Sequence, residues 1–89
     1  MAFTFDPEKS ARNFAQRGLS FDEVARLDWD RALIDEDTRK DYGETRLLVL
    51  APMSGRLFSV VVTPRGGDVR VISFRKASRK EIRKYGQKE

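Results

Sequence analysis

The sequence of 89 residues is long enough for one small core, and we expect residues 1–89 to form a single domain. It contains no cysteine and no histidine, which excludes disulfides, thiolate metal sites and the commonest general base, so any catalysis would use Arg, Lys, Tyr, Asp or Glu without a cofactor. No stretch approaches the ~18 apolar residues of a membrane span and the N-terminus lacks the features of a signal peptide, so we expect a cytoplasmic protein that does not bind membranes.

The net charge of +4 is distributed unevenly along the chain. Residues 1–45 contain 7 Lys+Arg and 11 Asp+Glu, a balance of −4, whereas residues 46–89 contain 11 and 3, a balance of +8. A positive field of this kind attracts RNA or DNA and also an acidic protein partner. Charge alone does not distinguish between these partners.

The N-terminal segment predicts a short strand followed by a helix. Residues 3–5 alternate as a strand does, and Asp6 and Pro7 are typical of the N-cap and first position of a helix. Gly18 suits the left-handed position that ends it. We expect Ala11 and Phe14 to face the core.

A second helix is predicted from the capping box Ser20–Glu23 to about Trp29. Residues 28–45 are polar and mostly acidic, which indicates a loop-rich segment around one short strand at residues 32–34. The acidic residues fit no EF-hand or other strict metal motif, so a solvated loop is the better interpretation.

From Thr45 onward the apolar pattern changes to a period of two. It predicts strands at residues 46–51, 56–63 and 69–76, joined by short turns and therefore antiparallel. A second capping box, Ser78–Glu81, starts a basic helix that we expect to bury Ile82 and Tyr85 and to stop before Gly86. The predicted fold class is α+β: an antiparallel meander packed against two N-terminal helices, with a C-terminal basic helix.

Two arginines of the last strand are the most informative candidates for a functional site. Arg70 is expected to share its face with Ile72 and Phe74, and an arginine in line with core residues needs either a bound anion or a structural ion pair, for instance with Glu44 or Asp68. Arg75 is an odd number of residues away, so it projects to the opposite face unless a bulge turns it. Both alternatives remain open at this point.

Further candidates surround this strand. Arg65 lies in the preceding turn, while Arg79 and Arg83 share one helix face, and each has a solvated surface as its simpler explanation. Tyr85 carries a phenol that can both donate and accept a proton, although core packing is the commoner role at such a position. The remaining N-terminal candidates are Lys9 and Arg17.

Several segments together resemble the BrnT family of toxins, from end to end of the chain. They are Phe3–Lys9, Asn13, Gly18–Ala25, Glu44–Arg46, Gly55–Arg56, Val61–Arg65, Arg70–Ala77 and Arg79–Tyr85. The resemblance implies a type II toxin of a toxin–antitoxin system, with a fold similar to the RelE ribonucleases and an endoribonuclease activity that blocks translation. It also implies a BrnA-like antitoxin, through which operator DNA would be bound only indirectly.

The matching polar residues imply the site residues. They are Lys9, Arg65, Arg70, Arg75, Arg79 and Tyr85. The sequence departs from the family at Arg17, where members usually carry a histidine, and at residues 28–30, where an Asp-Pro is missing. The resemblance thus predicts cleavage of RNA by attack of a ribose 2′-OH on the adjacent phosphate, without a metal. The alternative is a non-catalytic basic module that docks an antitoxin or nucleic acid.

Overall fold

The computed structural model describes residues 2–88, and within them five strands form one sheet in the order β1-β5-β4-β3-β2. The strands are β1 (Phe3–Thr4), β2 (Leu33–Glu36), β3 (Leu47–Met53), β4 (Arg56–Arg65) and β5 (Asp68–Lys76). The pairs β3–β4 and β4–β5 are antiparallel, as predicted. β2 also pairs antiparallel with β3, whereas β1 lies parallel to β5. The α+β class is confirmed, with a mixed sheet.

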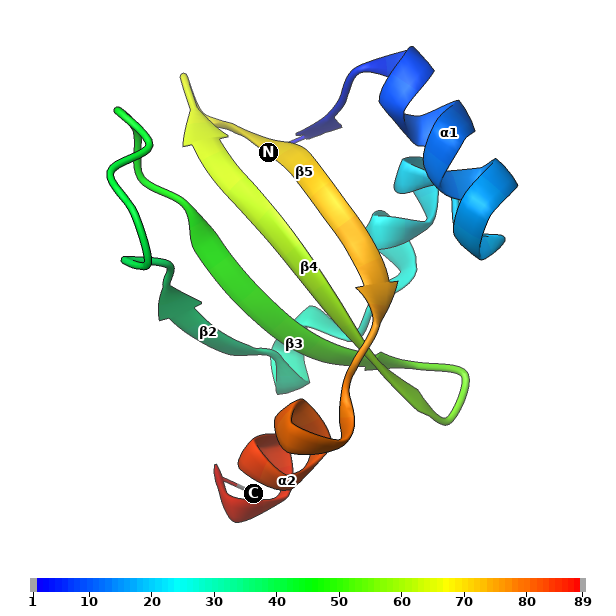
Figure 1. Ribbon diagram of the computed structural model, residues 1–89, viewed down its shortest axis with the longest axis vertical. Helices are drawn as coiled ribbons and strands as arrows, with labels where there is room; N and C mark the ends of the chain where they lie inside the picture. The colour runs from blue at the N-terminus through cyan, green and yellow to red at the C-terminus, as the bar shows by residue number, and fades with distance from the viewer. Residues whose placement is uncertain (1, 89) are drawn as a thin grey trace.

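Helical segments lie on both sides of this sheet. In Figure 1 two 3₁₀ turns, η1 (Phe21–Arg26) and η2 (Trp29–Arg31), lie behind the sheet, α1 (Pro7–Arg17) lies beside β5 at the upper right, and α2 (Arg79–Lys88) lies at the lower end of the sheet. The apolar core lies between the sheet and the N-terminal segments. Its buried members are Leu19, Phe21, Val24, Leu27, Val49, Ala51, Phe58, Val60, Val62, Val71 and Phe74.

Helix α1 begins and ends as predicted but is oriented differently. The Asp6 carboxylate accepts the Glu8 N–H at 2.9 Å, and Gly18 has the left-handed φ of 73°. The prediction that Ala11 and Phe14 face the core is wrong, because Phe14 is 59% exposed and Ala11 is exposed too.

Polar contacts hold α1 instead. The Ser10 hydroxyl accepts the Phe21 N–H at 2.8 Å, and the Asn13 amide donates to the carbonyls of Leu19 and Phe74 at 2.8 and 2.9 Å. These bonds join the helix to η1 and to β5. Apolar periodicity cannot reveal such an attachment, which explains why the buried side of α1 was assigned wrongly.

The second predicted helix is the 3₁₀ turn η1, and it ends earlier than expected. The capping box is present, with the Ser20 N–H donating to the Glu23 carboxylate at 2.9 Å. Leu27 turns out of the helix in an extended conformation, and its side chain is buried in the core. The short strand predicted near residues 32–34 is confirmed as β2.

A β-bulge in β5 decides which way its side chains point. Ser73 pairs with Val61 and Val71 pairs with Val62, so Ile72 has no partner residue on β4. Val71 and Phe74 can therefore both be buried although they are three residues apart. The prediction that Arg70 shares the face of Phe74 is wrong, and Arg75 lies on the same face as Arg70 because of the bulge.

Helix α2 also differs from the prediction at two points. Its capping box is confirmed by the Ser78 N–H donating to Glu81 at 2.8 Å and the Glu81 N–H donating to Ser78 at 3.2 Å. The expected burial of Ile82 is wrong, since its side chain is 52% exposed, and Tyr85 is half-buried. The helix also continues through Gly86 to Lys88.

The role of Asn13 is testable by substitution. Asn13→Ala leaves two carbonyl groups without their donor, so we expect a loss of about 2–3 kcal/mol in the free energy of unfolding. Urea denaturation followed by Trp29 fluorescence measures it. Gln16→Ala, on the exposed side of the same helix, should change stability by less than about 0.5 kcal/mol, and an equal loss in both variants would contradict this role.

Candidate nucleic-acid interface

The sheet surface that faces away from α1 and η1 is here called the open face. Figure 1 looks onto it, with α2 at its lower end. Hydroxyl, aliphatic and guanidinium groups make up this surface. The side chains that point to this side are Leu48, Leu50, Ser59, Val61, Thr63, Arg70, Ser73 and Arg75, of which Leu50, Ser59 and Thr63 are buried. Val61 of the central strand β4 is half-buried on this face.

Arg70 is the most unusual residue of the open face. It pairs along the backbone with Thr63 on one side and Thr4 on the other, and its side chain is half-buried. Within residues 2–88 its guanidinium makes no hydrogen bond or ion pair. The predicted ion pairs are absent: Glu44 binds Arg65, and Asp68 accepts the Ala2 N–H. The structural ion pairs considered for Arg70 are therefore not formed within residues 2–88.

Arg75 has a partner inside the protein. Its guanidinium binds Glu81 in a bidentate ion pair at 2.8 and 3.0 Å, and the Ser59 hydroxyl donates to the same carboxylate at 3.4 Å. Burial raises the pKa of Glu81, but the bonds from Arg75 and the Ser78 N–H outweigh it, so the pKa falls to about 2. Glu81 therefore stays ionised and fastens α2 to the sheet.

Arg65 also has a carboxylate partner, at the other end of the sheet. It binds Glu44 at 3.0 Å, and Arg46 approaches the same carboxylate at 3.4 Å. The hydrogen bond from Arg65, aided by Arg46, lowers the pKa of Glu44 despite the opposing effect of burial. Arg46 also lies over the Tyr42 ring, 4.2 Å from its centre. Sequence reasoning did not single out Arg46, although it belongs to a segment of the family resemblance.

The segment between β2 and β3 is ordered by a buried carboxylate. Asp37 accepts two hydrogen bonds from the Arg39 guanidinium, at 2.9 and 2.8 Å, and one from the Tyr42 hydroxyl at 3.1 Å. The Arg39 bond is the largest cause that holds the pKa of Asp37 well below its usual range. The acidic loop is thus a structured flank beside Glu44 rather than a freely solvated segment.

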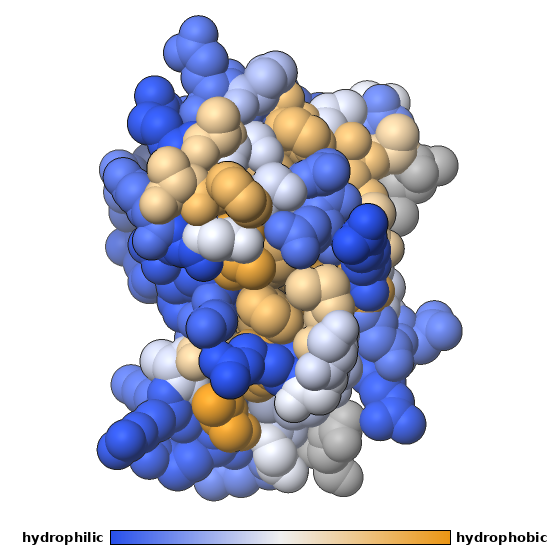
Figure 2. Space-filling model, turned by 90° about the vertical axis from the view of Figure 1, so that its right-hand side faces the viewer, coloured by the Kyte–Doolittle hydropathy of each residue, from blue (hydrophilic) through white to orange (hydrophobic). Residues whose placement is uncertain are grey.

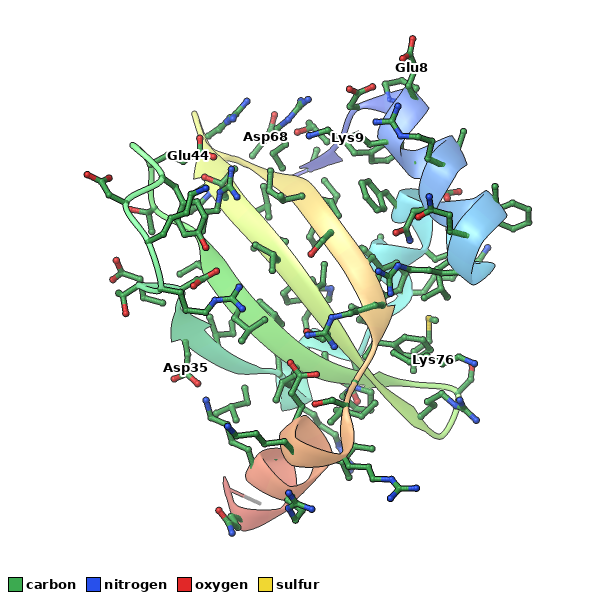
Figure 3. All side chains as sticks on the ribbon, in the orientation of Figure 1. Glu8, Lys9, Asp35, Glu44, Asp68 and Lys76 are labelled. Atoms are coloured by element: carbon green, nitrogen blue, oxygen red, sulfur yellow. The ribbon has the colours of Figure 1, made fainter. Side chains whose placement is uncertain are left out.

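The other candidate residues lie at different ends of the molecule. Arg79 is exposed at the start of α2, and the Tyr85 hydroxyl donates to the Arg31 carbonyl at 2.7 Å. Lys9 is exposed in the first turn of α1, and Figure 3 places it near Asp68, far from α2. The six predicted site residues therefore form two groups, with Lys9, Arg65 and Arg70 toward one end and Arg75, Arg79 and Tyr85 toward the other.

Arg17, the position where the family usually carries histidine, lies outside the open face. It is exposed at the end of α1 and lines a shallow cavity of about 250 Å³ with Leu19 and Lys76. Lys76 pairs with the core residue Phe58, which places this cavity on the helical side of the sheet. The side chain at position 17 is therefore separated from the Arg70 surface by the sheet itself.

Two kinds of site are missing from residues 2–88. No group of three or more Asp, Glu, Cys or His side chains there is placed to hold a metal ion. No helix in that range is long and apolar enough to cross a membrane.

Comparison with known families identifies the kind of protein that carries this surface. The sequence model of BrnT, the ribonuclease toxin of type II toxin–antitoxin systems, matches residues 5–81. The chain belongs to the BrnT family. No curated protein matches it at a significant level. Its family is therefore one of ribonuclease toxins, whose systems pair each toxin with an antitoxin, and the prediction from the sequence segments is confirmed at this level.

The ion pair of α2 predicts a pH dependence of stability. The folded pKa of Glu81, about 2, lies below the ordinary 4.5, so its stabilisation is complete above about pH 4.5 and is lost as the pH falls toward 2. Between pH 5 and 2 we expect the wild type to lose on the order of 1–2 kcal/mol more than Glu81→Gln. Urea midpoints across this range measure it.

A matched variant separates Glu81 from the other carboxylates. Glu8→Gln, an exposed carboxylate of α1, should keep the wild-type pH profile. Identical profiles for the wild type and Glu81→Gln would show that Glu81 does not stabilise the fold.

Proposed function

We propose that this BrnT-family chain is a metal-independent endoribonuclease that holds the RNA backbone on its open face. The observation that carries the proposal is Arg70, a half-buried cation without an anionic partner within residues 2–88. An arginine guanidinium has a planar array of donors that matches a phosphate group. The half-buried Ser73 lies on the same face and adds a hydroxyl, whereas the Thr63 hydroxyl is buried and donates to the Thr45 carbonyl at 2.7 Å.

The proposed reaction is an internal transfer at one phosphodiester. The ribose 2′-oxygen attacks the adjacent phosphorus and loses its proton, while the bond from phosphorus to the 5′-oxygen breaks and that oxygen gains a proton. The products are a 2′,3′-cyclic phosphate and a 5′-hydroxyl, and no metal is consumed or required. Charge develops on the non-bridging oxygens, where preorganised cations stabilise the transition state.

The candidate arginines differ in whether they must give up an ion pair in order to bind phosphate. Arg70 and exposed Arg79 can bind phosphate directly, since neither has a carboxylate partner in the described part of the chain. Arg65 and Arg75 must share their guanidinium groups with Glu44 and Glu81. We therefore assign Arg70 to the phosphate at the cleaved bond. Arg65, Arg75 and Arg79 would contact other phosphates along the RNA.

Tyr85 and Lys9 remain the two candidates for carrying protons. The Tyr85 hydroxyl donates to the Arg31 carbonyl, so it would have to release this bond in order to act as an acid. Lys9 is exposed and belongs to the same end of the molecule as Arg65 and Arg70. Position favours Lys9, which could act as a base only in its neutral amine form.

The biological setting is part of the same proposal. We infer a BrnA-like antitoxin that binds this toxin in the cytoplasm, and contact with operator DNA only through that antitoxin. RNA cleavage would inhibit translation. The implied relation to the RelE ribonucleases rests on the family resemblance and on the combination of a sheet, an N-terminal helical layer and a basic C-terminal helix.

Substitution of Arg70 is the direct test of the open face. Arg70→Ala should lower the rate of RNA cleavage by about 10²–10³, the usual cost of losing one preorganised donor to the transition state. Single-turnover cleavage of a labelled RNA measures the rate, and circular dichroism checks the fold. Arg12→Ala removes an exposed arginine of α1 and should leave the rate unchanged. Equal rates for wild type and Arg70→Ala would refute the proposal.

The products distinguish the proposed reaction from metal-dependent hydrolysis and from binding alone. In the presence of EDTA, purified toxin should still convert a long RNA into fragments ending in 2′,3′-cyclic phosphate, which mass spectrometry identifies. Fragments with 5′-phosphate ends, or complete inhibition by EDTA, would contradict the mechanism. A gel shift without any fragments would favour the binding module instead.

A further inference from the structure

A second surface lies at the outer end of α2. A groove of about 380 Å³ opens between the turn joining β3 to β4 and the first turns of α2. Its floor is apolar, formed by Leu57, Ala77 and Ile82. Figure 2 shows a small hydrophobic area on the lower part of this side of the molecule, bordered by strongly hydrophilic side chains. The groove shares no residue with the open face.

Ile82 is an apolar side chain that the fold leaves exposed to solvent. It is 52% exposed although it sits on a helix whose neighbouring residue, Glu81, is fixed against the sheet. The ion pair of Glu81 fixes the rotation of α2, and this rotation turns Ile82 outward. An exposed branched aliphatic side chain at the edge of an apolar groove is a common feature of protein interfaces.

The charges around the groove are all of one sign. Arg56 and Lys76 line it, and Arg79 lies one helical turn before Ile82, on the same side of α2. All three side chains are exposed and none forms an ion pair within residues 2–88. The one carboxylate of the first turn of α2, Glu81, is already bound by Arg75. The groove therefore offers an apolar centre inside an uncompensated cationic rim.

We propose that this groove binds an acidic segment of the antitoxin, which inserts one aliphatic side chain against Ile82 and Leu57 and places carboxylates beside Arg56, Lys76 and Arg79. Charge complementarity argues for an acidic partner. The apolar floor argues for a polypeptide rather than RNA, because phosphate and sugar would leave Ile82 uncovered. The inference rests on the proposed function only in taking the antitoxin as the partner.

Two substitutions test the groove without touching the open face. Purified toxin variants are titrated by calorimetry with the purified antitoxin of the same toxin–antitoxin system. Ile82→Gln, at the apolar centre, should weaken binding about tenfold or more. Arg56→Glu, on the rim, should weaken it to a similar degree, because it places a carboxylate opposite the carboxylates of the antitoxin. The matched controls are Ile34→Gln, since Ile34 is 49% exposed on β2, and Arg12→Glu on α1, and both should bind like the wild type.

RNA cleavage by the same variants separates this inference from the proposed function. Ile82→Gln and Arg56→Glu should cleave RNA at the wild-type rate while binding antitoxin less tightly. Unchanged antitoxin affinity in both variants would overturn the inference, as would slower RNA cleavage with normal antitoxin binding, which would assign the groove to RNA. A toxin dimer that only these variants disrupt would assign it to a second copy of the chain. Failure of the wild type to cleave RNA would refute only the proposed function.

Discussion

The β-bulge at Ile72 is the constraint on which both sides of the sheet depend. Without it, side chains three residues apart along β5 would point to opposite faces, and Val71 and Phe74 could not both be buried. The same extra residue turns Arg70 and Arg75 onto one surface. A single backbone irregularity thus completes the core on one face and aligns two guanidinium groups on the other.

A second constraint is the manner in which α2 is attached. Among the described residues of this helix, few large apolar side chains are buried. Its first turn is fixed instead by the Arg75–Glu81 ion pair and by a reciprocal cap with Ser78. Polar attachment fixes orientation more strictly than apolar packing, because hydrogen bonds depend on angle as well as distance. It also leaves Ile82 exposed. The position of α2 at the lower end of the open face therefore depends on charge.

Much of the fold could be predicted because its signals are local. Caps at Asp6, Ser20 and Ser78 and the period-two pattern of the meander all correspond to observed boundaries within a few residues. The orientation of the helices could not be predicted, because Asn13 and Glu81 bind groups that are distant in sequence or belong to the backbone. Residue type alone does not reveal that Phe14 and Ile82 are exposed, because phenylalanine and isoleucine are usually buried.

The candidate site shows the same division. Family resemblance named Arg70 among the candidate residues, but only the structure shows that Glu44 and Asp68 bind other groups and leave Arg70 without an ion pair within residues 2–88. The alternation of side chains along a strand places Arg70 and Arg75 on opposite faces. They share a face only because of the bulge, and this bulge has no reliable signature in the sequence. Which arginines have a carboxylate partner and which do not depends on the tertiary structure and cannot be predicted from the sequence.

The parallel pairing of β1 with β5 has a consequence for synthesis of the protein. Phe3 and Thr4 pair with Val69 and Arg70, and Asn13 of α1 binds the carbonyl of Phe74. During translation the N-terminal segment leaves the ribosome first but cannot complete its contacts until some 60 further residues have followed. A nascent toxin therefore has neither its core nor its Arg70 surface until nearly the whole chain has been made.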